Sequence, residues 1–383
     1  MHLQEPRLRQ WHRALMEIPA PPFSEEARAR WMLERMRELG LAATSIDREG
    51  NAIGYLREPV AGEPLVLLSA HIDTVFPAGT PLNITEEDAL LTGPGACDNA
   101  AGVTALLAIA AALRHANVET GANILFAANV GEEAEGNLRG MRYLLLPAHG
   151  RRIAFAVALE GSGNETVVTR ALGSRRFRVT LQGPGGHAWS DASLPNPAAV
   201  MAQAITTLYA CDWPAYPRTT INVGALESGG SVTAIPESAT ALFDLRSVDA
   251  TELLRAEVAL FRAVEDAVIA ANVKYDKPLL RSTIESIGER PAAELADDSP
   301  LLAIVRSVDR HLAMRTSECT ASTDANLPLS LGVQAIAIGA GGRSGGIHTT
   351  HEWYDATGRE LALRRVLLVL LDCCDLAVEA EAL

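Results

Sequence analysis

Short runs of consecutive apolar residues alternate with longer helical patterns in the first part of the chain. The runs at 65–68 (LVLL), 124–130 (ILFAANV) and 153–159 (IAFAVAL) contain almost no polar residues, and residues 98–116 have the apolar spacing of a helix. Continuous apolar runs are typical of strands buried on both faces, and intervening helices are typical of βαβ units. This pattern predicts an α/β domain with a doubly wound, mostly parallel sheet.

The pattern changes in the middle of the chain. Residues 174–183 and 239–247 alternate polar and apolar side chains, and each of these segments is followed by a helical pattern. Such alternation is typical of antiparallel strands with one solvated face. The buried-strand pattern returns towards the C-terminus. We therefore predict a large discontinuous domain at 1–172 and 291–383, with a smaller α+β domain inserted at 173–290.

Composition and charge restrict the possible partners. The chain has 383 residues, 48% of them hydrophobic, and a net charge of −14. Nucleic acids and anionic membrane surfaces are bound by clustered Lys and Arg, so this charge favours a small molecule or a peptide as the partner. No secretory signal is evident, and the longest late apolar run, 366–371, is too short to cross a bilayer. Five cysteines without a disulfide-like spacing indicate a cytoplasmic protein.

Ionisable residues stand directly after the predicted buried strands, after the Gly-rich loop that follows the apolar run at 333–339, or at the start of the helix at 98–116. Open α/β sheets bind ligands at the carboxyl ends of their strands, so these side chains are expected to converge on one edge of the sheet. The residues are His71, Asp73, Asp98, Glu132, Glu133, Glu160 and His348.

So many carboxylates in one place repel one another, and burial penalises each charge. Two divalent metal ions would remove this conflict. A mixture of histidine and carboxylate ligands suits Zn²⁺, and Co²⁺ and Mn²⁺ are alternatives. In this interpretation His71 and His348 each bind one metal ion, Asp98 bridges the two ions, and Glu133 and Glu160 each complete one site.

Two acidic residues are predicted to act beside the ligands. Residues two apart in a strand point the same way, so Asp73 is placed to accept the second ring N–H of His71 and to orient that ring. Adjacent glutamates do not easily reach the same ion. We expect Glu133 to bind metal while Glu132 acts as a general base.

Each motif also has a simpler interpretation when taken alone. The His71–Asp73 pair occurs in polar loops, the Glu132–Glu133 pair occurs in solvated turns, and Asp98 stands where a helix N-cap would. The occurrence of all of them after successive buried strands favours a functional site.

Five motifs together resemble the M20 family of co-catalytic zinc exopeptidases and deacylases. They are HID at 71–73, GPGACDNAAG at 93–102, GEEAEG at 131–136, ALEG at 158–161 and GGIHTTHEW at 345–353. The resemblance covers nearly the whole chain and implies a zinc-exopeptidase-like catalytic domain with an inserted lid and dimerisation domain.

The resemblance also implies roles for individual residues. A dinuclear zinc amide hydrolase would use Asp98 as bridging ligand and Glu132 as general base, with Glu133, Glu160 and His348 as further ligands. His351 stands where the family often has asparagine, and we interpret it as a hydrogen-bonding loop residue.

Three residues of the inserted domain are candidates for substrate binding. His187, in GPGGHAWSD, resembles a histidine that reaches the active site of the partner subunit in dimeric members and stabilises an oxyanion. Arg246 resembles an arginine that binds a substrate carboxylate, and Asn222 is a weaker candidate. A solvent-facing turn and a surface ion pair are the alternative interpretations of His187 and Arg246. Thr233 replaces an asparagine of many members, which puts that contact in doubt.

The branch of the family is less well defined. GSRRFRVTLQGPGGH and STDANLPLSLG look most like tripeptide-aminopeptidase-like members, so we expect an exopeptidase that acts on di- or tripeptides. An N-acyl-amino-acid deacylase or a carboxypeptidase is the alternative, and a non-catalytic peptide-binding relative is a more distant one. A nucleotide-dependent oxidoreductase is disfavoured because the Gly-rich segment at 339–346 is not in GxGxxG register. Cys97 is interpreted as a buried thiol, not a nucleophile.

Overall fold

The computed structural model describes residues 5–379 and divides the chain into two compact units. Unit 1 comprises the residues up to Ala171 and those from Glu294 onward, and unit 2 comprises Leu172–Ala293. The two units therefore meet in the sequence at 171/172 and at 293/294. Unit 2 lies within the sequence of unit 1.

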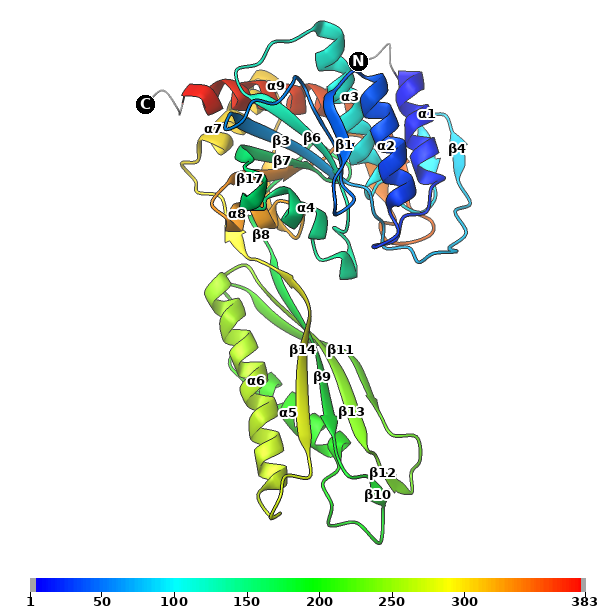
Figure 1. The fold of residues 1–383 in the computed structure, drawn as a ribbon, viewed down its shortest axis with the longest axis vertical. Coiled ribbons are helices and arrows are strands. Elements are labelled where there is room, and N and C mark those ends of the chain that lie inside the picture. Colours follow the sequence, from blue (N-terminus) through cyan, green and yellow to red (C-terminus); the bar gives the residue numbers. More distant parts are fainter. Residues whose placement is uncertain (1–4, 380–383) are drawn as a thin grey trace. The chain divides into compact units, whose positions relative to one another are not determined.

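Unit 1 is built on one large mixed sheet (Figure 1). Neighbouring strands β6, β3, β7 and β17 are parallel, whereas β1, β2 and β8 join antiparallel at the two sides. The strands in sheet order are β1 (Ala42–Ile46), β2 (Ala52–Tyr55), β6 (Asn123–Asn129), β3 (Pro64–His71), β7 (Arg152–Leu159), β17 (Gln334–Ile338), β8 (Thr166–Ala171) and β15 (Ala293–Glu294), and β16 (Ser317–Ala321) also pairs with β8. The prediction of an α/β fold with a largely parallel sheet is confirmed.

Helices cover the sheet of unit 1. Helices α3 and α9 contact each other and both contact β3 and β7, while α2 contacts β1 and β2. The helices are α1 (Glu5–Met16), α2 (Glu26–Glu38), α3 (Ala100–Ala116), α4 (Arg139–Leu144), α7 (Pro300–His311), α8 (Asn326–Ser330) and α9 (Arg359–Glu379). A second sheet contains β18 (Arg343–Gly345), β19 (Trp353–Asp355), β5 (Leu90–Thr92) and β4 (Thr85–Glu87).

The sequence of α3 explains both its burial and its position. Its residues are apolar around nearly the whole circumference, as is typical of a helix packed inside a protein. Asn99 caps its N-terminus, since the side-chain oxygen accepts a hydrogen bond from the Gly102 amide at 3.1 Å. The side-chain NH₂ group of Asn99 also donates a hydrogen bond to the Leu159 carbonyl at the end of β7. The start of α3 is thereby fixed beside the ends of the parallel strands.

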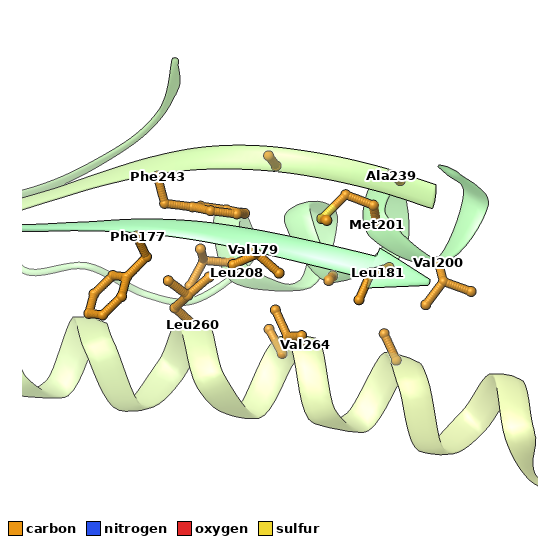
Figure 2. Close-up of a cluster of buried hydrophobic side chains, with 14 of the residues drawn as sticks. Phe177, Val179, Leu181, Val200, Met201, Leu208, Ala239, Phe243, Leu260 and Val264 are labelled. Carbon is orange, nitrogen blue, oxygen red and sulfur yellow. The ribbon is translucent and has the colours of Figure 1, made fainter. Parts of the chain in front are cut away.

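Unit 2 is a four-stranded antiparallel sheet with two helices on one face. The strand order is β11 (Thr219–Ser228), β13 (Ser238–Ser247), β9 (Gly173–Gln182) and β14 (Arg281–Arg290), and the helices are α5 (Pro197–Tyr209) and α6 (Ala250–Asn272). Figure 2 shows alternate residues of β9 and β13 pointing towards Leu260 and Val264 of α6. The opposite face carries polar side chains, as the alternating pattern predicted. A short ladder joins β10 (Gly186–His187) to β12 (Ala234–Ile235).

None of the helices within residues 5–379 combines the length and the apolar character that a bilayer span requires.

Candidate metal centre

The register of the parallel strands brings the predicted site residues to one edge of the unit 1 sheet. His71, the last residue of β3, is level with Asn129 of β6, and Ser69 is level with Ala158 of β7. Glu132 and Glu133 follow β6, and Glu160 follows β7. The Glu160 amide donates to Ile338 O at the end of β17, 3.0 Å away. The strand ends therefore converge as the sequence indicated.

Two groups of potential ligands share the carboxylate of Asp98. His71 Nε2 lies 3.0 Å from Asp98 Oδ1 and 3.3 Å from Glu160 Oε1. His348 Nε2 lies 3.0 Å from Asp98 Oδ2 and 3.3 Å from Glu133 Oε1. Within each group the candidate ligand atoms lie within 4.8 Å of one another. Asp98 thus presents one oxygen to each group, which is the arrangement that a carboxylate bridging two ions needs.

The chemistry of these groups fits two metal ions. Each group offers one imidazole and two carboxylates, a donor set that suits zinc and related divalent ions. Glu160 Oε2 is buried and has no hydrogen-bond partner among residues 5–379, which is costly for a carboxylate oxygen unless a cation binds it. Glu132 belongs to a third group with His71 and Glu133 and is only 4% exposed.

The charges of the cluster are strongly coupled. Burial alone would lower the pKa of His71, but Glu160, Asp73 and Asp98 outweigh burial and raise it well above its usual value. Asp98 and Glu133 raise the pKa of His348 to about 10. Burial raises the pKa of Glu160 to about 7, although His71 opposes it. Histidine ligands must be neutral to bind a metal ion, so binding at this centre would release protons.

Asp73 contacts more than the histidine it was predicted to orient. Its carboxylate Oδ1 lies 3.5 Å from His71 Nδ1, and the same nitrogen is 3.2 Å from the Asp73 carbonyl oxygen. The Asp73 carboxylate accepts hydrogen bonds from the amides of Glu132 at 3.0 Å and Glu133 at 2.7 Å. Asp73 therefore fixes the backbone of the acidic pair while it lies beside the His71 ring.

The loop that carries Asp98 depends on a residue that the sequence did not reveal. Glu352 is fully buried, and its carboxylate accepts hydrogen bonds from the amides of Cys97 and Asp98, both at 2.7 Å, and of Gly95 at 3.3 Å. His12 supports the same loop, because its Nε2–H donates to the Ala96 carbonyl at 2.6 Å. The one sequence feature that could have indicated this support of the loop is the position of Glu352 directly after IHTTH at 347–351.

His348 is the most exposed member of the cluster, with 54% of its side-chain area accessible. Its backbone adopts φ of 65°, a left-handed conformation that is uncommon for residues other than glycine and is often found at functional sites. His351 belongs to none of the potential ligand groups among residues 5–379, and its amide donates to Thr349 Oγ1.

Two motifs outside the cluster have local explanations. The Gly-rich segment at 339–346 leads into β18 and not into a helix, so it lacks the helix N-terminus that a dinucleotide phosphate would bind. Burial raises the pKa of the Cys97 thiol to about 11, which disfavours it as a nucleophile.

The predicted substrate residues lie in unit 2. Arg246 Nε donates to Asp244 Oδ2 at 2.7 Å, and Asn222 faces Asp244 across the β11–β13 ladder. His187 is exposed, and its Nδ1 accepts hydrogen bonds from the amides of Trp189 and Ser190. Thr233, also exposed, contacts the Ser231 hydroxyl. Arg246 and Asn222 thus share one face of the sheet, whereas His187 belongs to the separate β10–β12 ladder.

Comparison with known proteins identifies the family. The sequence model described as Peptidase family M20/M25/M40 matches residues 67–372. The chain belongs to this family. The resemblance carried by the five motifs is thereby confirmed.

Individual relatives extend this result. A putative LysW-lysine/LysW-ornithine hydrolase of Pyrococcus abyssi is 37% identical over 165 residues, which cover 43% of this M20 chain and 43% of the relative. The chain thus matches less than half the length of that relative.

Solved structures match almost the entire fold. The aminopeptidase PepT of Bacillus cereus aligns with a TM-score of 0.76 at 18% identity, covering 96% of this chain and 98% of its own. The Bacillus subtilis protein YXEP, described as a dinuclear metal binding peptidase, aligns with a TM-score of 0.73 at 14% identity, covering 98% and 99%. At these identities the likeness establishes the fold of the M20 chain.

Proposed function

We propose that this M20 protein hydrolyses peptide or amide bonds of small substrates at a centre that holds two divalent metal ions. The observation that carries the proposal is the sharing of Asp98 between two groups of potential ligands, one with His71 and Glu160 and the other with His348 and Glu133. Zn²⁺ is our preferred ion, because imidazole and carboxylate donors suit it, and Co²⁺ or Mn²⁺ would suit the same donors.

Glu132 is the proposed general base. Two such ions, held by His71, Asp98, Glu133, Glu160 and His348, would polarise the scissile carbonyl and lower the pKa of a water molecule. The Glu132 carboxylate takes the proton of the attacking water and delivers it to the leaving amine. Asp73 supports this transfer because its carboxylate holds the Glu132 amide at 3.0 Å. The backbone carrying the base is therefore fixed before substrate binds.

The proposed substrates are di- or tripeptides, cleaved from the amino end. The fold of PepT supports this choice, and the branch-specific motifs of the sequence favour it. We assign substrate binding to Arg246, which would pair with a carboxylate, to Asn222, and to His187, which would stabilise the oxyanion. The last role requires a homodimer formed through unit 2, in which His187 serves the partner's site. We also propose a cytoplasmic location, which the five free cysteines support.

The metal-loaded protein should be assayed on tripeptides, dipeptides, N-acetyl amino acids and N-carbamoyl amino acids. We expect release of the N-terminal residue from tripeptides to have the highest kcat/KM. A preference for N-acetyl amino acids would reassign the protein to the deacylases. If the metal-loaded chain cleaves none of these four classes of substrate, the proposed function is wrong.

A further inference from the structure

Arg139 connects two distant acidic residues beside the acidic pair of the site. It is the first residue of α4, and its guanidinium donates to Glu25 Oε2 at 2.7 Å and to Glu49 Oε1 at 2.8 Å. A further hydrogen bond of 2.7 Å reaches the Glu49 carbonyl, and the guanidinium carbon lies 5.0 Å from the centre of the Phe23 ring. Only 18% of its side-chain area is exposed. The conformation of Arg139 is therefore fixed from several sides.

The side chain of Arg139 lies directly on Gly131, the residue before Glu132. A Cβ atom at Gly131 would be 2.5 Å from Arg139 Cγ and 2.7 Å from its Nε. Gly131 has φ of 64°, a left-handed conformation that favours glycine. A Cβ at Gly136 would in turn meet the Gly131 backbone at 2.5 Å. The turn that orients Glu132 is thus packed between Arg139 and Gly136.

The remaining contacts of this turn fix the residues on either side of Gly131. Asp73 accepts the amides of Glu132 and Glu133, and Asn51 Oδ1 accepts the Val130 amide at 3.0 Å. Neither acceptor contacts Gly131 itself in these bonds. The packing of Arg139 on one side and of Gly136 on the other therefore restrains rotation of the backbone at Gly131.

The ion pair that holds Arg139 is costly. Glu25 is 2% exposed, and its Oε1 has no hydrogen-bond partner in the described part of the chain. Burial raises the pKa of Glu25 in spite of its bond to Arg139. Buried ion pairs often contribute little net stability, because desolvation offsets their attraction. The ion pair between Arg139 and Glu25 is therefore better explained by its effect on the position of the Gly131 turn than by a contribution to the stability of the fold.

We propose that Arg139 is a positioning residue for Glu132, held in place by Glu25 and Glu49. This inference rests on the proposed role of Glu132 as the general base. Arg139 acts through the Gly131 backbone and takes no part in proton transfer. Its loss would leave the base intact but misplaced, and misplacement of a catalytic group by about 1 Å lowers the rate by about 100-fold.

A cavity beside Arg139 makes the proposal testable by chemical rescue. It has a volume of about 370 Å³ and is lined by Phe23, Glu25, Ile46, Glu49 and Arg139 among others. Removal of the Arg139 side chain would enlarge this space and leave two carboxylates without their cation. Ethylguanidinium has the shape and charge to bind there and to cover Gly131 again.

The experiment compares Arg139→Ala with wild type on the best peptide substrate, with and without ethylguanidinium. We expect kcat to fall about 10- to 100-fold, with KM and metal content close to wild type. Ethylguanidinium should restore part of kcat in a saturable manner. The matched control is Arg142→Ala on the same helix, since Arg142 bonds the Asn137 carbonyl, whereas the atoms nearest to a Cβ at Gly131 all belong to Arg139. It should keep its kcat and show no response to ethylguanidinium.

The outcomes separate this inference from the proposed function. Inactive wild type would refute the proposed function, whereas active wild type with unchanged kcat in Arg139→Ala would refute only the positioning role. A loss that no ethylguanidinium concentration restores, or one caused by lost metal, would also overturn the proposal. If Arg139→Ala does not fold, the double variant Glu25→Gln, Glu49→Gln replaces it, because it neutralises both carboxylates that hold the Arg139 side chain over Gly131. An unchanged kcat in that variant would contradict the inference.

Discussion

The candidate residues of the two units differ in how completely their charges are satisfied. At the sheet edge of unit 1, His71 is fully buried, and Glu160 has a buried oxygen for which the described residues offer no hydrogen-bond partner. On the open sheet face of unit 2, Arg246 has 46% of its side-chain area exposed and is already paired with Asp244. A buried charge without a full set of partners costs free energy that a bound cation would recover, whereas an exposed and paired charge needs no ligand. The structure therefore supports the metal centre more strongly than the substrate residues.

Loss of the shared ligand should have the largest effect. In Asp98→Ala both ligand groups lose a member, so we expect neither ion to bind tightly. The loss of several kcal/mol of transition-state stabilisation corresponds to a fall in kcat/KM of about 1000-fold or more. Metal analysis after gel filtration, together with the peptide assay, would measure both effects. Retention of two ions per chain by this variant would contradict the bridging role of Asp98.

Replacement of the base should separate catalysis from metal binding. Glu132→Gln keeps the size of the side chain but removes its ability to accept a proton, so kcat should fall about 100-fold or more. Its metal content should stay at the wild-type level. If this variant loses metal instead, Glu132 is a ligand and its role has been misassigned.

The loop contacts of Glu352 should have a smaller effect. Glu352→Gln replaces one of the two acceptor oxygens facing the loop amides with an NH₂ group, which would loosen the loop that carries Asp98. We expect metal affinity to fall about 10- to 100-fold, measured by competition with a chromophoric chelator. Glu360→Gln, on the exposed side of α9, is the matched control. Equal affinity in the two variants would show that the Glu352 contacts do not support the centre.

The smallest effect is expected in unit 2. Arg246→Ala should raise KM for a peptide with a free carboxylate about tenfold and should change kcat little, because an exposed charged hydrogen bond contributes about 1–2 kcal/mol. Arg178→Ala is the matched control, since Arg178 lies on the same sheet face and pairs with Glu285. The same rise in KM for an amidated peptide would argue against carboxylate recognition.

The sequence predicted the cluster of potential metal ligands from a simple geometric rule. Parallel strands end at the same edge of a sheet, so residues that directly follow apolar runs, such as His71 and Glu160, come together whatever their sequence separation. The strands of unit 2 were also predictable from the sequence. One face of its sheet packs on helices, so apolar and polar side chains alternate along each strand. Both predictions follow from the periodicity of side chains along strands.

The supporting contacts were not predictable in the same way. Glu352 binds amides more than 250 positions earlier in the chain, and Arg139 joins Glu25 to Glu49 across separate elements. No periodic pattern encodes such pairs, and a buried glutamate looks the same in sequence as an exposed one. The Asp73 carboxylate also accepts hydrogen bonds from the amides of the acidic pair, and these bonds were missed for the same reason. The pattern of one strand predicts contacts within that strand, such as the one between Asp73 and His71, but not contacts with another segment.

The most direct test of the dinuclear centre is a metal titration of the chelated protein. Zn²⁺ is added to metal-free chain, bound metal is counted per chain, and peptide hydrolysis is measured at each step. We expect hydrolysis to be absent after chelation and to reach its maximum as binding approaches two ions per chain. Hydrolysis that persists in the metal-free chain, or that already reaches its maximum at one bound ion per chain, would contradict the dinuclear centre.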